Sequence, residues 1–286
     1  MQEYWFILTL LVTLSIGIVA FINKIFAEKW YNPQLSALVL YLIMFVFSLV
    51  SLLFQWFVWF SELGIKNILL CIIWGMQFYG YSLIMMKALK YLPTSTYFIT
   101  VRLSSSFILL FIWILFFWDS LTLEQIIGFL LWVLAMSFLF EKDTSKNIDY
   151  KKWTIFLILW ILFLVFWHTA TKLLSIDFSY IPTFLTIAFA SALFTGIIFW
   201  FHHIKNNFSD IQWILKLNLF QSVFYFSYFY FLFYVYQIWD LGISYKIQSY
   251  SPFIPIILAA IIFREKITKY KAIWIGLSAV SLYFFK

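Results

Sequence analysis

Long apolar segments follow one another along almost the whole of this chain, with only short polar breaks between them. A helix needs about 20 apolar residues to cross the hydrocarbon core of a membrane, and the chain offers about ten such segments. We expect membrane-spanning helices at residues 5–26, 34–58, 68–87, 94–117, 123–140, 153–173, 180–201, 213–237, 243–263 and 271–285. The sequence therefore predicts an all-α integral membrane protein.

The composition excludes a soluble globular domain, because 65% of the 286 residues are hydrophobic and only 11% are charged. The first apolar run, Phe6–Phe26, is as long as the others, so we expect a span there and no cleaved signal peptide. The net charge of +7 comes mostly from basic residues that flank the spans and meet lipid headgroups. We therefore expect the bilayer, and no nucleic acid, as a partner.

The chain consists of two similar halves. The stretch Ser251–Ser281 repeats the layout of residues 105–135, which places Glu265 on Asp119. We read both acids as turn residues between helices. The longest charged break, residues 141–152, connects a first repeat at 1–140 to a second at 153–286. Because each half holds five predicted helices, an odd number, the second is inverted relative to the first, and such repeats place a binding site between them near the membrane midplane.

Basic and titratable residues inside the predicted spans are the first candidates for a binding site, because each is costly in hydrocarbon. Arg102 lies about 12 Å into the fourth span at 1.5 Å per residue, and so approaches the midplane. Lys246 lies in the ninth span, the counterpart of the fourth in the second half. The alternative to a substrate contact is that its side chain extends to the lipid headgroups. His168 lies one turn before Lys172 in the sixth span. We expect Arg102, Lys246 and His168 to contact a substrate.

A stripe of amide and aromatic side chains recurs in the two halves. Its members are Trp74, Gln77 and Tyr81 in the third span and Gln221, Tyr225 and Tyr228 in the eighth. Their spacing puts each set on one face of a helix. Such groups commonly line ligand pockets, and we expect substrate contacts here. The alternative is that they bond across packed helices.

Missing residues narrow the function further. No Asp or Glu lies deep in a predicted span, which weighs against an exporter of lipophilic cations, whereas buried Arg and Lys suit a carboxylate, a phosphate or a zwitterion. With three histidines and one cysteine, Cys71, the chain has no evident catalytic or metal-binding set. We expect no enzyme activity and no cofactor.

Three motifs resemble the EamA-like branch of the drug/metabolite transporter superfamily. They are GIVAFINK at Gly17–Lys24, ALKYLPTS at Ala88–Ser95, and SP followed by REKIT within Ser251–Thr268. The resemblance implies ten helices in two inverted five-helix repeats around a central cavity, with the last helix of each half at the periphery. The chain departs from the pattern around Tyr41, where many relatives carry a basic residue.

We therefore expect a secondary transporter, an exporter or exchanger, that moves a small polar metabolite such as an amino acid or organic anion by alternating access. A multidrug or lipophilic-compound exporter and a noncatalytic membrane assembly protein stay open. Pro252 and Pro255 each remove a helix hydrogen bond and predict a break or hinge in the ninth span.

The expected partners are a small-molecule substrate and a proton or counter-substrate, with the protein a monomer or homodimer in the plasma (inner) membrane. The distribution of Lys and Arg favours both termini outside the cell, whereas the resemblance implies cytoplasmic termini, and both orientations stay open.

Overall fold

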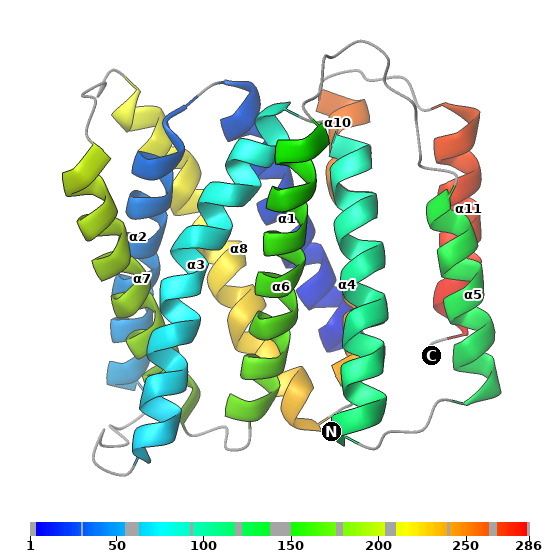
Figure 1. The fold of residues 1–286 in the computed structure, drawn as a ribbon, viewed down its shortest axis with the longest axis horizontal. Helices are drawn as coiled ribbons and strands as arrows, with labels where there is room; N and C mark the ends of the chain where they lie inside the picture. The colour runs from blue at the N-terminus through cyan, green and yellow to red at the C-terminus, as the bar shows by residue number, and fades with distance from the viewer. Residues whose placement is uncertain are drawn as a thin grey trace.

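The computed structural model describes residues 4–29, 31–54, 63–91, 94–117, 122–137, 150–175, 180–203, 210–238, 241–262 and 268–284. Within these ranges the chain folds into helices joined by short turns, without a strand. The helices are α1 (Trp5–Glu28), α2 (Pro33–Phe54), α3 (Ile65–Tyr91), α4 (Thr94–Phe117), α5 (Leu123–Ser137), α6 (Tyr150–Leu174), α7 (Ile181–His203), α8 (Ile211–Ile238), α9 (Leu241–Gln248), α10 (Phe253–Ile262) and α11 (Lys269–Tyr283). They stand side by side, with α1 beginning and α11 ending toward the same end of the bundle (Figure 1).

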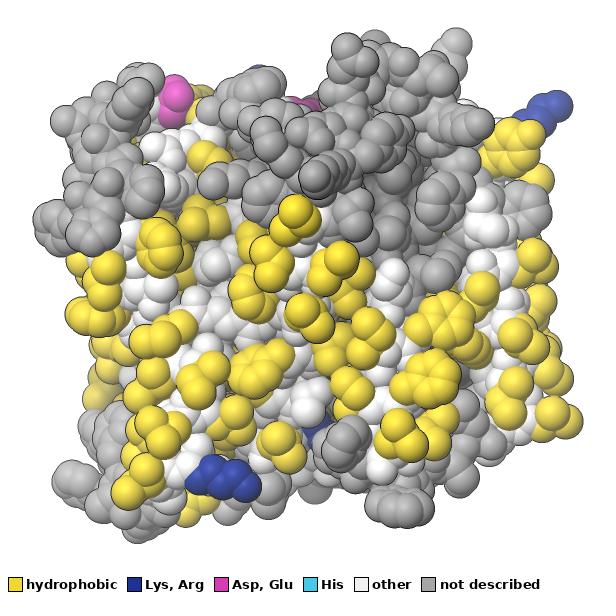
Figure 2. Space-filling model, in the orientation of Figure 1, with side chains coloured by type: hydrophobic (Ala, Val, Ile, Leu, Met, Phe, Trp, Pro, Cys, Tyr) yellow, Lys and Arg dark blue, Asp and Glu magenta, His cyan; other side chains and the backbone are white. Residues whose placement is uncertain are grey.

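The outer surface of the bundle is apolar. Figure 2 shows hydrophobic side chains spread across the middle of one face, with Lys and Arg near its ends. In the described ranges, five segments are long and apolar enough to cross a membrane: Phe6–Glu28, Pro33–Phe54, Ile65–Met86, Ile181–Trp200 and Ser244–Ile262. Shorter apolar helices accompany them. A surface of this kind is solvated by lipid tails, so the chain is a multi-pass integral membrane protein.

The ninth predicted span is divided into α9 and α10 by residues 249–252, with Pro252 at the end of the break and Pro255 in the first turn of α10. Pro252 has no N–H to donate to the Gln248 carbonyl, which accepts from Ser251 at 2.9 Å instead. In the same way the Ser251 carbonyl accepts from Ile254 at 3.2 Å in place of Pro255. These three-residue bonds tighten the turn without unwinding the segment. The break that the sequence predicts is therefore present, and Gln248 is the last residue before it.

Helices of the first half pack mainly against helices of the second. The principal contacts pair α1 with α8, α2 with α7 and with α8, and α3 with α7 and with α6. The last helices, α5 and α11, pack on each other at one edge of the bundle (Figure 1). The centre is consequently built from α1, α2, α3, α6, α7 and α8.

Gly75 brings α3 closer to α7 than a side chain would permit. A Cβ atom at this position would lie 2.0 Å from the Ala188 carbonyl oxygen. One turn along the same seam, the Ser191 hydroxyl donates to the Ile72 carbonyl at 2.9 Å. Such close backbone approach is how helices gain van der Waals contact in lipid, where burial from water supplies little drive.

We expect Gly75→Ala to lower the free energy of unfolding by about 1 to 3 kcal/mol or more, because the added methyl group meets backbone that cannot turn aside. Gly276→Ala is the matched control, since a Cβ there meets no atom within 4 Å and alanine favours the helix. Thermal unfolding of both variants in detergent measures the difference. Equal unfolding temperatures for the two variants would contradict the close seam.

Candidate functional site

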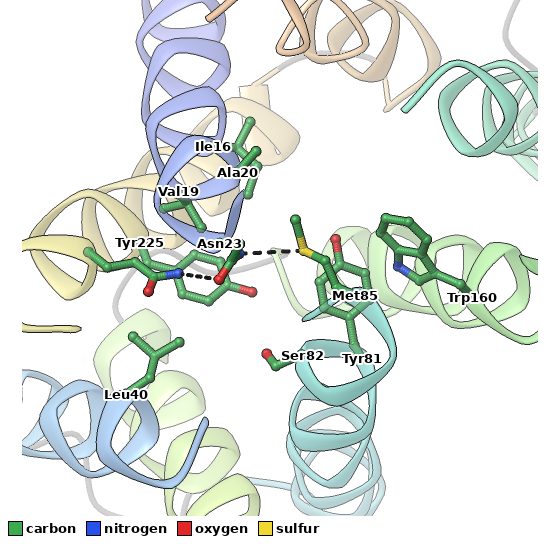
Figure 3. Close-up of a pocket in the computed structure, with 11 residues that line it drawn as sticks. Ile16, Val19, Ala20, Asn23, Leu40, Tyr81, Ser82, Met85, Trp160 and Tyr225 are labelled. Atoms are coloured by element: carbon green, nitrogen blue, oxygen red, sulfur yellow. Dashed lines mark hydrogen bonds between the residues drawn. The ribbon is translucent and has the colours of Figure 1, made fainter. Parts of the chain in front are cut away.

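A small cavity lies at the centre of the bundle between α1, α2, α3, α6 and α8 (Figure 3). Its volume is about 10 Å³, at the lower limit for holding one water molecule. The residues that line it are Ile16, Val19, Ala20, Asn23, Leu40, Tyr81, Ser82, Met85, Trp160, Gln221 and Tyr225. The central space is thus nearly closed, and its lining combines amides and hydroxyls with aromatic and aliphatic groups.

Two amide side chains from opposite halves meet at this cavity. The Gln221 Nε2 of α8 donates to the Asn23 Oδ1 of α1 at 3.0 Å, and the Asn23 Nδ2 reaches the Met85 Sδ at 3.5 Å (Figure 3). The Gln221 Oε1 is buried and has no hydrogen-bond partner within the described ranges. A thioether is a weak acceptor, so the Asn23 amide is also only weakly satisfied. The cavity therefore offers one buried acceptor and one under-used donor.

Tyr41 of α2 belongs to a buried hydroxyl network beside the cavity. Its hydroxyl is buried, donates to the Phe78 carbonyl at 2.8 Å, and lies 2.6 Å from the Ser82 Oγ. Ser82 in turn lines the cavity. The network of Tyr41 and Ser82 is formed by neutral hydroxyl groups and borders the cavity at this place.

An aromatic cluster closes the centre beside the cavity. Trp167 stacks on Phe229 at 5.2 Å and also contacts Phe78, with 4.6 Å between ring centroids. Four predicted site residues belong to this cluster through these rings: Trp74, Tyr81, Tyr225 and Tyr228. Tyr81 and Tyr225 also line the cavity. The two stripes therefore meet, although Trp74 and Tyr228 contact other rings and not the cavity.

Gln77 bonds across the bundle. Its Nε2 donates to the Phe163 carbonyl of α6, and Gln77 does not line the cavity. Its Oε1 has no partner in the part of the chain that the structure describes. The Gln77 nitrogen thus connects α3 to α6, which agrees with the alternative that the stripe residues bond across packed helices.

Lys246, one of the two predicted basic residues, does not line the cavity. Lys246 is buried, with its Nζ 3.0 Å from the centroid of the Phe129 ring and 5.1 Å from that of Trp132. The expected alternative, a side chain that reaches the headgroups, is therefore wrong, because the amine turns into the bundle. Arg102 lies in α4, but its side chain is outside the described part of the structure.

His168 is buried in a separate polar group and does not line the cavity. Its Nδ1 lies 2.6 Å from the Tyr236 hydroxyl, and its ring meets that of Tyr245 edge to face at 4.4 Å. One turn further on, Lys172 donates to the Tyr236 carbonyl at 2.5 Å. This group joins α6 to α8 and α9.

Sequence reasoning missed Asn23, Ser82, Met85 and Trp160 as cavity residues. Asn23 carried a signal, since it is a polar residue within the GIVAFINK motif and an apolar span. Ser82 and Met85 continue the stripe face beyond Tyr81 by one and four positions. Trp160 carried none, because the chain is rich in aromatic residues throughout.

The fold and the enclosed, mixed-polarity cavity between helices define a polytopic membrane protein with an internal site. Residues 151–285 match the sequence model of the EamA-like transporter family, the family that the resemblance predicted. This match is consistent with the drug/metabolite transporter superfamily, a class of membrane transporters.

Known structures support the fold over nearly the whole chain. A crystal structure, described only as that of a protein, covers 95% of this chain and 95% of its own at a TM-score of 0.67 and 12% identity. That likeness concerns the fold alone. No match was found among curated proteins.

We expect Lys246→Met to unfold at the same temperature as the wild type or higher, and Lys246→Ala to unfold lower. Burying an ammonium costs several kcal/mol, and contact with rings returns about 2 kcal/mol, so an apolar chain of similar length loses little. Alanine leaves a void among Phe107, Phe129 and Trp132. If Met proves as harmful as Ala, the charge itself holds these helices together.

Proposed function

We propose that this protein is a secondary transporter that exports or exchanges a small metabolite, with an amino acid as the leading class and an organic anion as the next. The substrate binds between the two halves, at an enlarged form of the central cavity. Transport proceeds by alternating access, in which the halves rock around the site. Two inverted five-helix repeats provide this motion.

The packing pattern supports the repeat. In the proposed repeat, α1 corresponds to α6, α2 to α7, α3 to α8 and α5 to α11, and α9 and α10 together correspond to α4. When each helix is exchanged for its counterpart, every contact between the halves becomes another contact that is observed. The packing of α1 on α8 becomes that of α6 on α3, and α2 on α8 becomes α7 on α3. The pairs α2 with α7 and α5 with α11 map onto themselves. Such exchange is what a two-fold relation between halves requires.

The unpaired Gln221 Oε1 is the observation that carries the substrate class. A buried acceptor without a donor costs about 1 to 3 kcal/mol, which a ligand ammonium or hydroxyl would recover. The Asn23 Nδ2, now on a thioether, is a donor for a carboxylate, and the rings of Tyr81 and Tyr225 suit an apolar side chain. An amino acid has all three of these parts.

A lipophilic compound is the second candidate. No charged residue is among those that line the cavity, and Tyr81, Trp160 and Tyr225 give it a largely aromatic wall. A wall of this kind binds an apolar solute without a fixed counter-charge. The two candidates differ in whether the amide pair matters.

We expect Gln221→Leu to weaken amino-acid binding about tenfold, since one lost hydrogen bond of about 1.4 kcal/mol corresponds to that factor. Purified protein is heated with amino acids, organic acids and lipophilic cations, and a bound compound raises the unfolding temperature. Titrating the compound that binds then gives the dissociation constant for each variant.

Gln212→Leu on the exposed first turn of α8 is the control, and we expect it to bind like the wild type. A compound that binds equally well to wild type and Gln221→Leu argues against the amide pair and favours the lipophilic candidate. If no compound stabilises the wild type, the transporter proposal loses its site.

A further inference from the structure

A buried hydrogen-bonded chain connects His168 to the break between α9 and α10. The His168 Nδ1 lies 2.6 Å from the Tyr236 hydroxyl, and the Gln248 Nε2 donates to that hydroxyl at 3.3 Å. The exposed fractions of the three residues are 1%, 0% and 0%. Gln248 ends α9, four residues before Pro252. The chain therefore runs from α6 through α8 to the point where the ninth span is interrupted.

One acceptor in this chain is unused. The Gln248 Oε1 is buried and has no hydrogen-bond partner in the described ranges. A half-turn of the amide exchanges its oxygen and nitrogen, so either atom can face the Tyr236 hydroxyl. The site thus has two possible hydrogen-bonding arrangements.

Of the side chains in this cluster, the His168 imidazole is the one whose unperturbed pKa lies near neutral pH. On its own helix Lys172 bonds to the Tyr236 carbonyl. From α9, Tyr245 meets its ring and bonds to Ser105 of α4 at 2.6 Å. From α3, Tyr81 contacts the adjacent Trp167. The side chain of Arg102, and all of Asp240, lie outside the described part of the chain.

We propose that His168 binds the proton that is coupled to transport, and that Tyr236 transmits its charge state to Gln248 at the α9–α10 break. This inference rests on the proposed transport function and names its coupling ion. A buried ionisable group within a membrane span is well placed for such a role, because its protonation changes the local hydrogen bonding completely.

The two states follow from the donors and acceptors. With His168 neutral, the Tyr236 hydroxyl donates to Nδ1 and accepts from the Gln248 Nε2. When a proton from water binds Nδ1, that atom becomes a donor to the Tyr236 oxygen, and the Tyr236 hydrogen needs a new acceptor. The Gln248 Oε1 provides it once the amide turns. Release of the proton to the other side of the membrane restores the first state.

The break can pass this change to the cavity because α1 touches both of its sides. The Thr13 hydroxyl of α1 lies 3.2 Å from the Ile247 carbonyl, next to Gln248. Beyond the break, a Cβ atom at Gly17 would lie 2.6 Å from the Ile254 Cβ. Asn23, two turns further along α1, lines the cavity. Proton binding and substrate binding therefore act on one continuous set of contacts.

The test measures the break without any substrate. Spin labels are placed at Leu219→Cys on α8 and Ile261→Cys on α10, two exposed positions, with the buried Cys71 replaced by Ser. Distance distributions in lipid nanodiscs are recorded between about pH 5.5 and pH 8.5, the range in which a histidine titrates. We expect two populations whose ratio changes with pH, by at most about tenfold per pH unit because one proton is bound.

His168→Asn keeps a hydrogen-bonding group near the Nδ1 position but does not titrate, so we expect one ratio at every pH. Gln248→Leu removes the acceptor and should give the same loss of response. His202→Asn, on α7, is the matched control and should respond like the wild type. A pH response that persists in His168→Asn, or a wild type that does not respond, overturns the proposal.

If His168→Asn does not fold, ¹⁵N-histidine NMR of the wild type gives the decision. The chain has three histidines, and His202→Asn and His203→Asn identify their own signals. We expect the remaining signal to titrate between about pH 5 and pH 8, and its failure to do so overturns the proposal. Loss of the transport function would instead appear as an absence of binding in the separate compound panel, with the spin-label result unchanged.

Discussion

Close backbone contact between helices is the condition on which this bundle depends. Lipid tails solvate apolar side chains as well as other apolar side chains do, so the helices cannot be held by burial from water alone. Gly75 removes the one side chain that would separate α3 from Ala188 on α7, and Gly17 does the same for α1 beside Ile254. Both seams join one half of the chain to the other.

Two polar groups are buried within the apolar bundle, next to the aromatic cluster at its centre. The aromatic cluster around Trp167 and Phe229 lies between two polar groups, one at Asn23 and Gln221 and the other at His168 and Tyr236. Each group is satisfied mainly within itself, and a few amide oxygens are left over. These unpaired atoms lower stability. In a transporter they also mark the places where a different set of hydrogen bonds can form.

The sequence predicts the helices better than the site. Apolar length locates each helix, and the missing N–H of Pro252 locates the break, because both are local properties of the chain. The stripe spacing places Tyr81 on one face of α3 and Gln221 and Tyr225 on one face of α8, and these three residues line the same cavity. The same reasoning does not predict the contacts of Lys246, because its neighbours Phe129 and Trp132 come from a helix of the other half. Periodicity within one helix carries no information about such a partner, and the contacts of a buried lysine depend on it entirely.

The pairing of α5 with α11 bears on how the protein is made. During synthesis α5 enters the membrane with the first half, whereas α11 leaves the ribosome only after α6 to α10. The apolar face of α5 must therefore stay in lipid, without its main partner, until α11 has been translated and inserted. Completion of this edge of the bundle is thus tied to the translation of α11, and a ribosome that stops before α11 leaves an open edge that quality-control proteases can recognise.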